Sequence, residues 1–354
     1  MLYKEDWERS KQRFEALWNR ELVDRCCVSV VAPKKCGSFA EEIVPENYRD
    51  RVRYWTDPEW ILNRNVQRME NTYFGGDAIP MIWLNVGPCG LAADFGSEYT
   101  FAEKTTWFDA VLPDGYTKPL SFNPQSKLLN ITKELATHFS KEGKGKFFVS
   151  MPDNTSAIDT MAHIRGSENV LEDFITEPDN LKAALKIVTK AWLDTNEFFY
   201  DITTQCNEGG TCVGWLNTWA PGKHAQIQCD ISVMISPCTF EEFIFEELEQ
   251  ACKSMEYSLY HFDGIEQLRH LDILLTIKEL DMIQWTSVVG QPPPTEFIPA
   301  LKKIQAAGKC LLINTTPDNI KPLLSNLSPR GLYFVTGTST EEEARDLVKM
   351  VEVY

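Results

Sequence analysis

The stretch YSLYHFDGIEQLRHLDILLTIKELDMIQWT (residues 257–286) holds two short apolar runs, YSLYHF and DMIQWT, with a helical pattern between them. Both runs are rich in aromatic and aliphatic residues, which is typical of strands buried in a parallel sheet. The same pattern follows directly, because the periodic segment EFIPALKKIQAAG (296–308) leads into KCLLIN (309–314). Strand, helix and strand in succession predict parallel βα units.

The pattern extends in both directions along the chain and yields eight strands. They are expected at residues 26–32, 78–85, 146–151, 227–234, 257–262, 281–286, 309–314 and 331–336. Helices are expected between them, for example after Asp57-Pro58, after Glu177-Pro178 and after Thr340, where a capping residue or a proline precedes a periodic apolar face. Eight such units predict a single (β/α)8 barrel domain over residues 1–354.

Three segments do not fit the repeat. Residues 1–25 are expected to form an N-terminal helix, and residues 86–125, rich in glycine, proline and aromatic residues, are expected to be an insertion over the C-terminal mouth of the barrel. Residues 205–225 contain the apolar run TCVGWLNTW and are expected to be a second insertion over the mouth, with a hairpin strand leading into the fourth barrel strand.

Composition narrows the classes of function and partner. The chain carries 35 Lys and Arg against 51 Asp and Glu, a formal charge of −16, which disfavours nucleic acids and anionic membranes as partners. No apolar run is long enough for a membrane span, and the start MLYKEDWERSKQRF has the pattern of a charged amphipathic helix rather than a signal peptide. The ten cysteines include no CxxC pair, so we expect reduced thiols and a cytoplasmic protein.

In a barrel of this kind, the active site is built from residues at the C-terminal ends of the strands. These positions are unusually polar and aromatic for strands that are otherwise apolar, so we expect them to bind a small-molecule substrate. Trp215 joins Trp219 and Trp285 in an expected aromatic wall. The predicted substrate-binding residues are Trp83, Asn85, Asp153, Trp219, Gln284, Trp285, Asn314 and Thr336.

His261 and Asp263 give the sharpest local signal. Two residues apart at a strand end, they point to the same side, so they could hold a metal together, or Asp263 could orient His261 as a general base. Alternatively, His261 donates to a carbonyl and Asp263 caps the next helix. Asp230, a lone carboxylate in the strand expected at 227–234, is predicted to join them as a catalytic residue, because such a group is costly to bury without a partner.

Three segments resemble the superfamily that holds uroporphyrinogen decarboxylase and the cobalamin-dependent methyltransferases. They are QIQCDISVMISPCTFEEFIFEELEQ (226–250), the run from residue 257 through SVVGQP to 292, and IQAAGKCLLINTTPDNIKPLL (304–324). DTMAHIRGSENVLEDFITEPDNL (159–181) resembles the same superfamily, and the likeness spans roughly residues 55–350. The resemblance implies a barrel and an enzyme acting on a small molecule.

Within that resemblance, the decarboxylase motifs are replaced. The regions where these enzymes carry an Arg-rich motif, an aspartate, a tyrosine and a histidine read KKCGSFAEE, IWLN, IDTMAHI and FVTGT here, with Asn85 or Leu84, Met161 and Thr336 at the matching positions. The predicted pocket also offers no arginine to a substrate with eight carboxylates. We therefore expect no turnover of uroporphyrinogen.

The methyltransferase branch binds zinc through a His-x-Cys after strand five and a cysteine near the last strand. His261 matches the first ligand, Asp263 replaces the second, and Thr336 or a neighbour stands at the third. The resemblance implies a methyltransferase that uses a corrinoid or thiol acceptor, with zinc as cofactor and a corrinoid protein as partner. A decarboxylase of a small acid, a carbohydrate-active or other small-molecule enzyme, and a non-catalytic binding barrel stay open, as does a homodimer.

Overall fold

The structure is a computed structural model that describes residues 1–34, 39, 42–286, 288 and 290–353. Its parallel strands correspond to the eight predicted ones. They are β1 (Cys27–Pro33), β3 (Met81–Leu84), β6 (Phe148–Pro152), β9 (His224–Gln228), β10 (Tyr257–Asp263), β11 (Met282–Thr286), β12 (Cys310–Asn314) and β13 (Leu332–Gly337). The fourth was predicted wrongly at 227–234, because β9 ends at Gln228 and a 3-10 helix, η1 (Asp230–Met234), follows it.

Six of these strands lie in chain order in one parallel sheet, β1-β13-β12-β11-β10-β9, in which the last strand pairs with the first. Strands β3 and β6 form a separate parallel pair. An additional strand, β2 (Thr72–Gly76), pairs antiparallel with β1 at the sheet edge. The chain therefore has an α/β fold with a parallel central sheet, as predicted. Among the described residues no ladder joins β3 to β1 or β6 to β9, so closure into a complete barrel stays a prediction.

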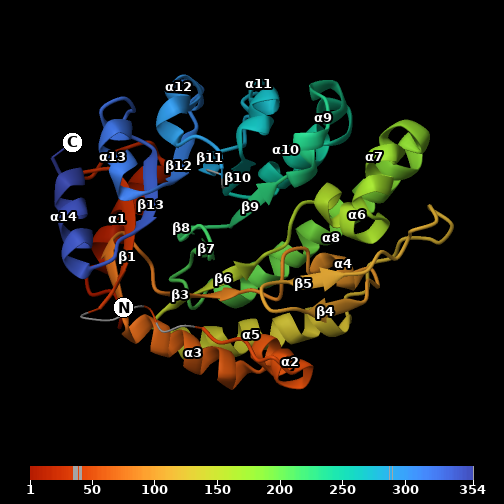
Figure 1. Cartoon of the computed structure of the whole chain (residues 1–354), viewed down its shortest axis with the longest axis horizontal. Coiled ribbons are helices and arrows are strands. Elements are labelled where there is room, and N and C mark those ends of the chain that lie inside the picture. Colours follow the sequence, from red (N-terminus) through yellow and green to blue (C-terminus); the bar gives the residue numbers. More distant parts are fainter. Residues whose placement is uncertain (35–38, 40–41, 287, 289, 354) are drawn as a thin grey trace.

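Helices cover the outer side of the strands. Figure 1 shows one group over β9–β13 and a second group beyond β3 and β6. The first group is α9 (Pro237–Phe243), α10 (Phe245–Ser254), η2 (Ile265–His270) with α11 (Leu271–Leu274), η3 (Pro294–Phe297) with α12 (Ile298–Ala306), α13 (Pro317–Leu324) and α14 (Glu341–Val351). The second group is α3 (Pro58–Glu70), α5 (Lys127–Gly143) and α8 (Pro178–Thr203). The predicted helix starts are confirmed at Asp57, whose side chain accepts from the Trp60 N–H, and at Thr340, which forms a capping box with Glu343.

The segment 86–125 contains the short elements α4 (Leu91–Asp94), β4 (Tyr99–Phe101) and β5 (Thr106–Phe108). It lies beside α6 (Ala157–Arg165), since the N–H groups of Val111 and Leu112 both donate to the carbonyl of Ile164. Two further helices outside the strands are α2 (Tyr48–Thr56) and α7 (Ser167–Thr176). No helix in the described ranges has an apolar stretch long enough to cross a bilayer.

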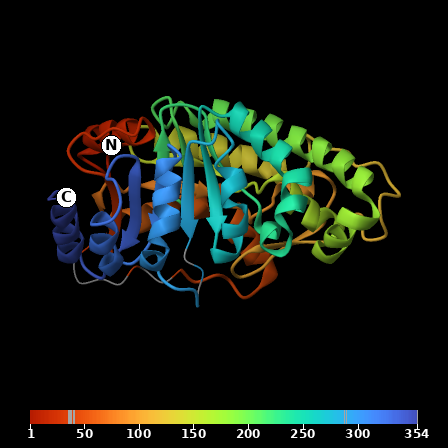
Figure 2. The ribbon, with the colours of Figure 1, turned by 90° about the horizontal axis from the view of Figure 1, so that it is seen from above.

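The segment 205–225 forms a hairpin of β7 (Thr211–Val213) and β8 (Thr218–Ala220) and lies against α1 (Trp7–Trp18). The Trp18 indole donates to the carbonyl of Trp219 at 2.9 Å. The Cys310 thiol, at the start of β12, donates to the carbonyl of Leu17 at 3.1 Å, which places α1 at the N-terminal ends of the strands, as Figure 2 shows. The hairpin strands therefore pack at the end opposite the mouth, which corrects the predicted position of this insertion.

The strands bury side chains on both faces because alternate side chains point to opposite faces. Inward-facing residues near the strand starts form an aromatic and aliphatic core with α1 and the hairpin. This inner core includes Trp7, Phe14, Phe148, Trp219, Leu259, Met282, Leu312 and Tyr333. The outward-facing residues, such as Tyr260, Phe262 and Ile283, pack beneath the helices in a second core. Polar side chains occupy the inward positions further along the same strands.

Candidate functional site

His261 and Asp263 lie on the inward face of β10, on the same side as the core residue Leu259. Tyr260 and Phe262 point the other way and are buried beneath the helices. The parallel register sets His261 beside Gln284 of β11. The pairing therefore brings polar inward-facing groups of neighbouring strands together at the carboxyl end of the sheet.

A buried glutamine orients the His261 ring. The Nδ1 atom of His261 lies 2.5 Å from Oε1 of Gln284, whose amide nitrogen donates to the Thr286 hydroxyl at 2.6 Å. An amide oxygen can only accept, so in this arrangement Nδ1 carries the proton. In the neutral ring the lone pair is then on Nε2, which lies 3.9 Å from Oδ1 of Asp263. A histidine held in this way by its other ring nitrogen is the usual form of a metal ligand or a general base.

Asp230 reaches the same place from the end of β9. The carboxylate of Asp159, on α6, accepts from the backbone N–H groups of Asp230 and Ile231 at 2.9 and 3.1 Å, and there the chain turns from strand into η1. Gln228 donates to Oδ2 of Asp230 at 2.9 Å. One ligand atom each from Asp230, His261 and Asp263 lies within 4.8 Å of the others. We call these three residues the triad.

Carboxyl groups crowd this end of the sheet. Burial raises the pKa of Asp230, and Asp263 adds to the effect while His261 opposes it. Burial and the nearby charge of Asp230 raise the pKa of Asp153 to about 7, and burial raises that of Asp159 well above its usual value. A divalent cation between the triad residues would compensate the repulsion between the carboxylates. One imidazole nitrogen and two carboxylate oxygens suit zinc or a similar first-row ion.

Trp215, in the turn between β7 and β8, covers one side of His261. The two rings meet edge to face with centroids 4.8 Å apart. Trp215 also lines a cavity of about 590 Å³, together with Trp83 and Asn85, two of the predicted substrate-binding residues. The triad residues do not line this cavity, so Trp215 stands between the cavity and His261.

Two other predicted residues also lie at the carboxyl ends of strands. Asp153, just after β6, accepts a hydrogen bond from Gln226 at 2.7 Å. Asn314, the last residue of β12, shares the inward face with Leu312, and its Oδ1 is buried without a hydrogen-bond partner in the described part of the chain. An unsatisfied buried acceptor of this kind is a position where a ligand or water can donate.

Trp219, Trp285 and Thr336 are not brought to the site, which corrects their predicted role. Trp219 is fully buried, donates to the Asn207 carbonyl and packs edge to face on Trp7 in the inner core. Trp285 alternates with Gln284, so it points outward and stacks on Phe262. Thr336 shares the outward face of β13 with Phe334. The expected aromatic wall, which favoured a carbohydrate ligand, is therefore not formed.

Sequence reasoning missed Gln226, Gln228 and Thr286. The two glutamines alternate in HAQIQ (224–228) as His261 and Asp263 alternate in β10, so the signal was present but was hidden when the strand was placed too late. Most of KKCGSFAEE (34–42), which corresponds to the Arg-rich motif of the decarboxylases, lies outside the described residues, as do residues 287 and 289 of SVVGQP.

Comparison with known proteins gives a likeness in fold. The chain superposes on the solved structure of a methyltransferase from Methanosarcina mazei with a TM-score of 0.63 at 14% sequence identity, covering 97% of this chain and 98% of that one. No protein family model matches the sequence, and no curated protein does. At this identity the likeness establishes a shared fold over nearly the whole chain.

Proposed function

We propose that this chain is a methyltransferase-like enzyme of the uroporphyrinogen decarboxylase superfamily, with its strands closed into a barrel. It would move a methyl group between a small molecule and a thiol or corrinoid acceptor. The observation that carries the proposal is the triad, because His261 stands with a free Nε2 beside two carboxylates at the carboxyl ends of parallel strands. The likeness in fold to a methyltransferase supports it.

In this proposal Asp230, His261 and Asp263 hold a zinc ion. A bound zinc ion lowers the pKa of a thiol, so that a thiol acceptor is present as the nucleophilic thiolate. Gln284 keeps the Nδ1 proton in place and so presents Nε2 to the ion. Trp215 shields one face of the imidazole from water. The two carboxylates balance the charge of the ion and leave room for a further ligand.

The acceptor is either a small thiol or a corrinoid, and the corrinoid could be carried by a partner protein. The methyl acceptor determines which protein partners are needed, so it is tested first. Purified protein, loaded with zinc, is mixed with methylated donors of three classes, namely amines, ethers and thioethers, and with either a small thiol or free reduced corrinoid. Methylated acceptor is measured by mass spectrometry.

We expect product with at least one pair of donor and acceptor, and its loss in Asp230→Asn and His261→Ala. Asp272→Asn, an exposed carboxylate paired with Lys303, serves as the matched control and should keep full activity. A protein that binds zinc but methylates neither acceptor from any of the donors would contradict the proposal.

A decarboxylase of a small acid is the second candidate, because one observation favours it. Burial and the charge of Asp230 raise the pKa of Asp153 to about 7, so a share of this carboxyl group at the carboxyl end of β6 is protonated near neutral pH and could deliver a proton to a carbanion. Release of carbon dioxide from small acids that is lost in Asp153→Asn and unaffected by removal of zinc would favour this candidate over methyl transfer.

A further inference from the structure

The cavity of about 590 Å³ next to the triad lies between β1 and β3, where the described strands share no ladder. The apolar part of its lining comes from β3, from the end of β1 and from α3 and α5, and includes Val31, Ile61, Met81, Trp83, Leu135 and Phe139. Polar side chains such as Asn65, Asn85 and Asn217 line it as well. Its volume falls in the range of about 300–1,000 Å³ that is usual for small-molecule pockets.

Gly214, in the turn of the hairpin, lines this cavity next to Trp83. A Cβ atom at Gly214 would lie 2.7 Å from Cβ of Trp83, so only glycine lets the hairpin turn approach the Trp83 ring so closely. The next residue, Trp215, then reaches both the cavity and the His261 ring. A molecule that fills the cavity would therefore contact the same indole that covers His261.

The outer rim of the cavity carries two cations that are not neutralised. Arg68 and Lys104 both line it, and among the described residues neither has a carboxylate within 4.0 Å. Arg68 instead donates to the amide oxygen of Asn65 at 2.9 Å. Arg64 differs, because it is paired with Glu42 and lies over the Tyr54 ring.

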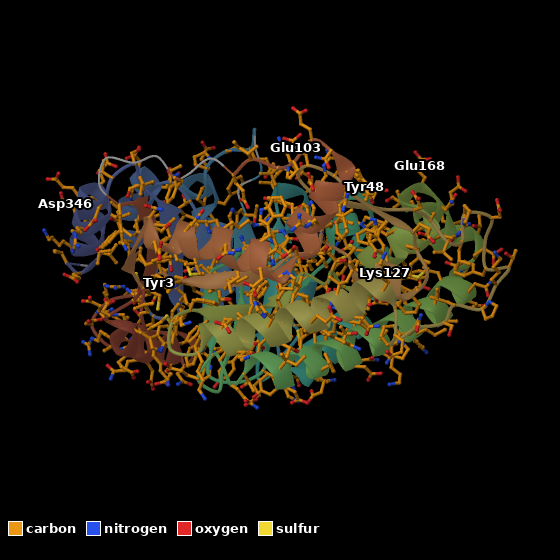
Figure 3. All side chains as sticks on the ribbon, turned by 90° about the horizontal axis from the view of Figure 1, so that it is seen from below. Tyr3, Tyr48, Glu103, Lys127, Glu168 and Asp346 are labelled. Carbon is orange, nitrogen blue, oxygen red and sulfur yellow. The ribbon has the colours of Figure 1, made fainter. Side chains whose placement is uncertain are left out.

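Glu42 and Glu103 also line the cavity, so its lining carries two carboxylates beside the three cations. Glu42 is paired with Arg64, whereas the side chain of Glu103 is exposed, extends outward from the ribbon in Figure 3 and forms no ion pair within the described residues. In a chain of net charge −16, a cavity whose described lining carries three cations and two carboxylates has a local excess of positive charge, and this excess attracts an anion.

We propose that this cavity binds an amphipathic anion, with its apolar body between Trp83 and Trp215 and its single acidic group at Arg68 and Lys104. Apolar walls and convergent cations match the two halves of such a molecule. The lining of the cavity by itself supports the binding of this class of molecule. The identification of the anion as the substrate of the triad rests on the function proposed above.

The test uses two fluorescent probes of nearly the same shape and the whole protein. The first, 1-anilinonaphthalene-8-sulfonate, has an aromatic body and one acidic group, and the second, N-phenyl-1-naphthylamine, lacks the acidic group. We expect the anionic probe to bind about tenfold more weakly to the Arg68→Ala/Lys104→Ala variant than to the native chain, because charge-assisted contacts are lost. The neutral probe should bind both within about twofold. Arg68→Lys should retain most of the affinity.

Lys133→Ala is the matched control. Lys133 borders a separate apolar pocket of about 300 Å³ with Phe122 and Phe198, where either probe could bind non-specifically. Loss of the anionic probe in Lys133→Ala rather than in the Arg68/Lys104 variant, or equal affinity in all variants, would overturn the proposal. If the probe binds as expected and competes with no methyl donor, the cavity assignment stands and the link to methyl transfer fails.

Discussion

The two ends of the inward-facing strand surface differ in chemistry although the backbone is the same. At the starts of β10 and β11, Leu259 and Met282 pack with Trp219 and α1 in a fully buried core. Two residues further along the same strands, the inward positions become His261 and Gln284. The first end is a closely packed apolar core that stabilises the fold, while the second collects polar groups.

Residues of one type have different roles at the two ends. Trp219 and Trp215 stand in the same hairpin, yet Trp219 donates to a backbone carbonyl in the core and Trp215 lies at the boundary between a cavity and His261. The position along the strand axis separates a structural indole from one at a candidate site. Substitutions at the two ends should therefore have opposite consequences.

The largest effect is expected for Trp219→Ala. Removing this buried side chain should lower the free energy of unfolding by about 3–5 kcal/mol, because it leaves a cavity among Trp7 and Phe148. Denaturant unfolding followed by circular dichroism measures it. At the other end, Asp263→Asn should leave the stability of the metal-free protein within about 0.5 kcal/mol or raise it, since it removes one charge from a crowded group. Equal losses in both variants would remove the distinction between the two ends.

A smaller effect is expected at Gln284, which touches His261 and not the proposed ion. Gln284→Leu should lower zinc affinity by about 10–100-fold, as is usual when the partner that orients a ligand is lost. Isothermal titration calorimetry on the purified protein gives the affinity. Gln226→Leu, which removes a glutamine of the neighbouring strand that bonds Asp153, is the control and should bind zinc like the native chain. Unchanged affinity in Gln284→Leu would show that His261 is not held for an ion.

The sequence predicted the sheet better than it predicted the residues of the site. Strands β10 to β13 were found within a residue or so, because each is a short apolar run bounded by clear helix signals. Strand β9 was misplaced because IQCDISVM has the pattern of one apolar run. In the structure the strand ends where Asp159, far away in sequence, accepts hydrogen bonds from the N–H groups of Asp230 and Ile231. No pattern in the neighbouring sequence predicts such a contact.

The same limit applies to individual side chains. Alternation along β11 could have separated inward Gln284 from outward Trp285, but Trp219 is buried by Trp7 and α1, which lie about two hundred residues away in the chain. His261, Asp263 and Asp230 were named together from the sequence, and the structure brings them together. Their catalytic and metal-binding roles stay predictions.

A pH-dependent effect is expected for a buried carboxyl beside the polar end. Glu247, on α10, accepts from the Ala157 N–H, and burial raises its pKa from about 4.5 to about 7. Because its pKa is raised in the folded state, Glu247 contributes fully to the stability of the fold below about pH 4.5, where it is protonated in both states. This contribution is lost as the pH rises through about 7. Native protein should therefore lose stability between about pH 4.5 and 8, and Glu247→Gln should lose up to about 3 kcal/mol less.

Thermal unfolding at several pH values measures this difference. The neighbouring exposed residue provides the control, because Glu246→Gln should reproduce the native pH profile. A pH profile of Glu247→Gln that is identical to the native one would mean that Glu247 is ionised in the folded protein.

Metal stoichiometry is the direct test of whether Asp230, His261 and Asp263 form one metal site. Native protein, His261→Ala and the control His163→Ala are each incubated with zinc, passed through a desalting column and analysed by mass spectrometry of the elements. His163 lies in α6 against Phe108 and outside the triad. We expect about one zinc ion per chain in the native protein and the control, and a loss of at least about tenfold in His261→Ala. Equal zinc content in all three proteins would contradict it.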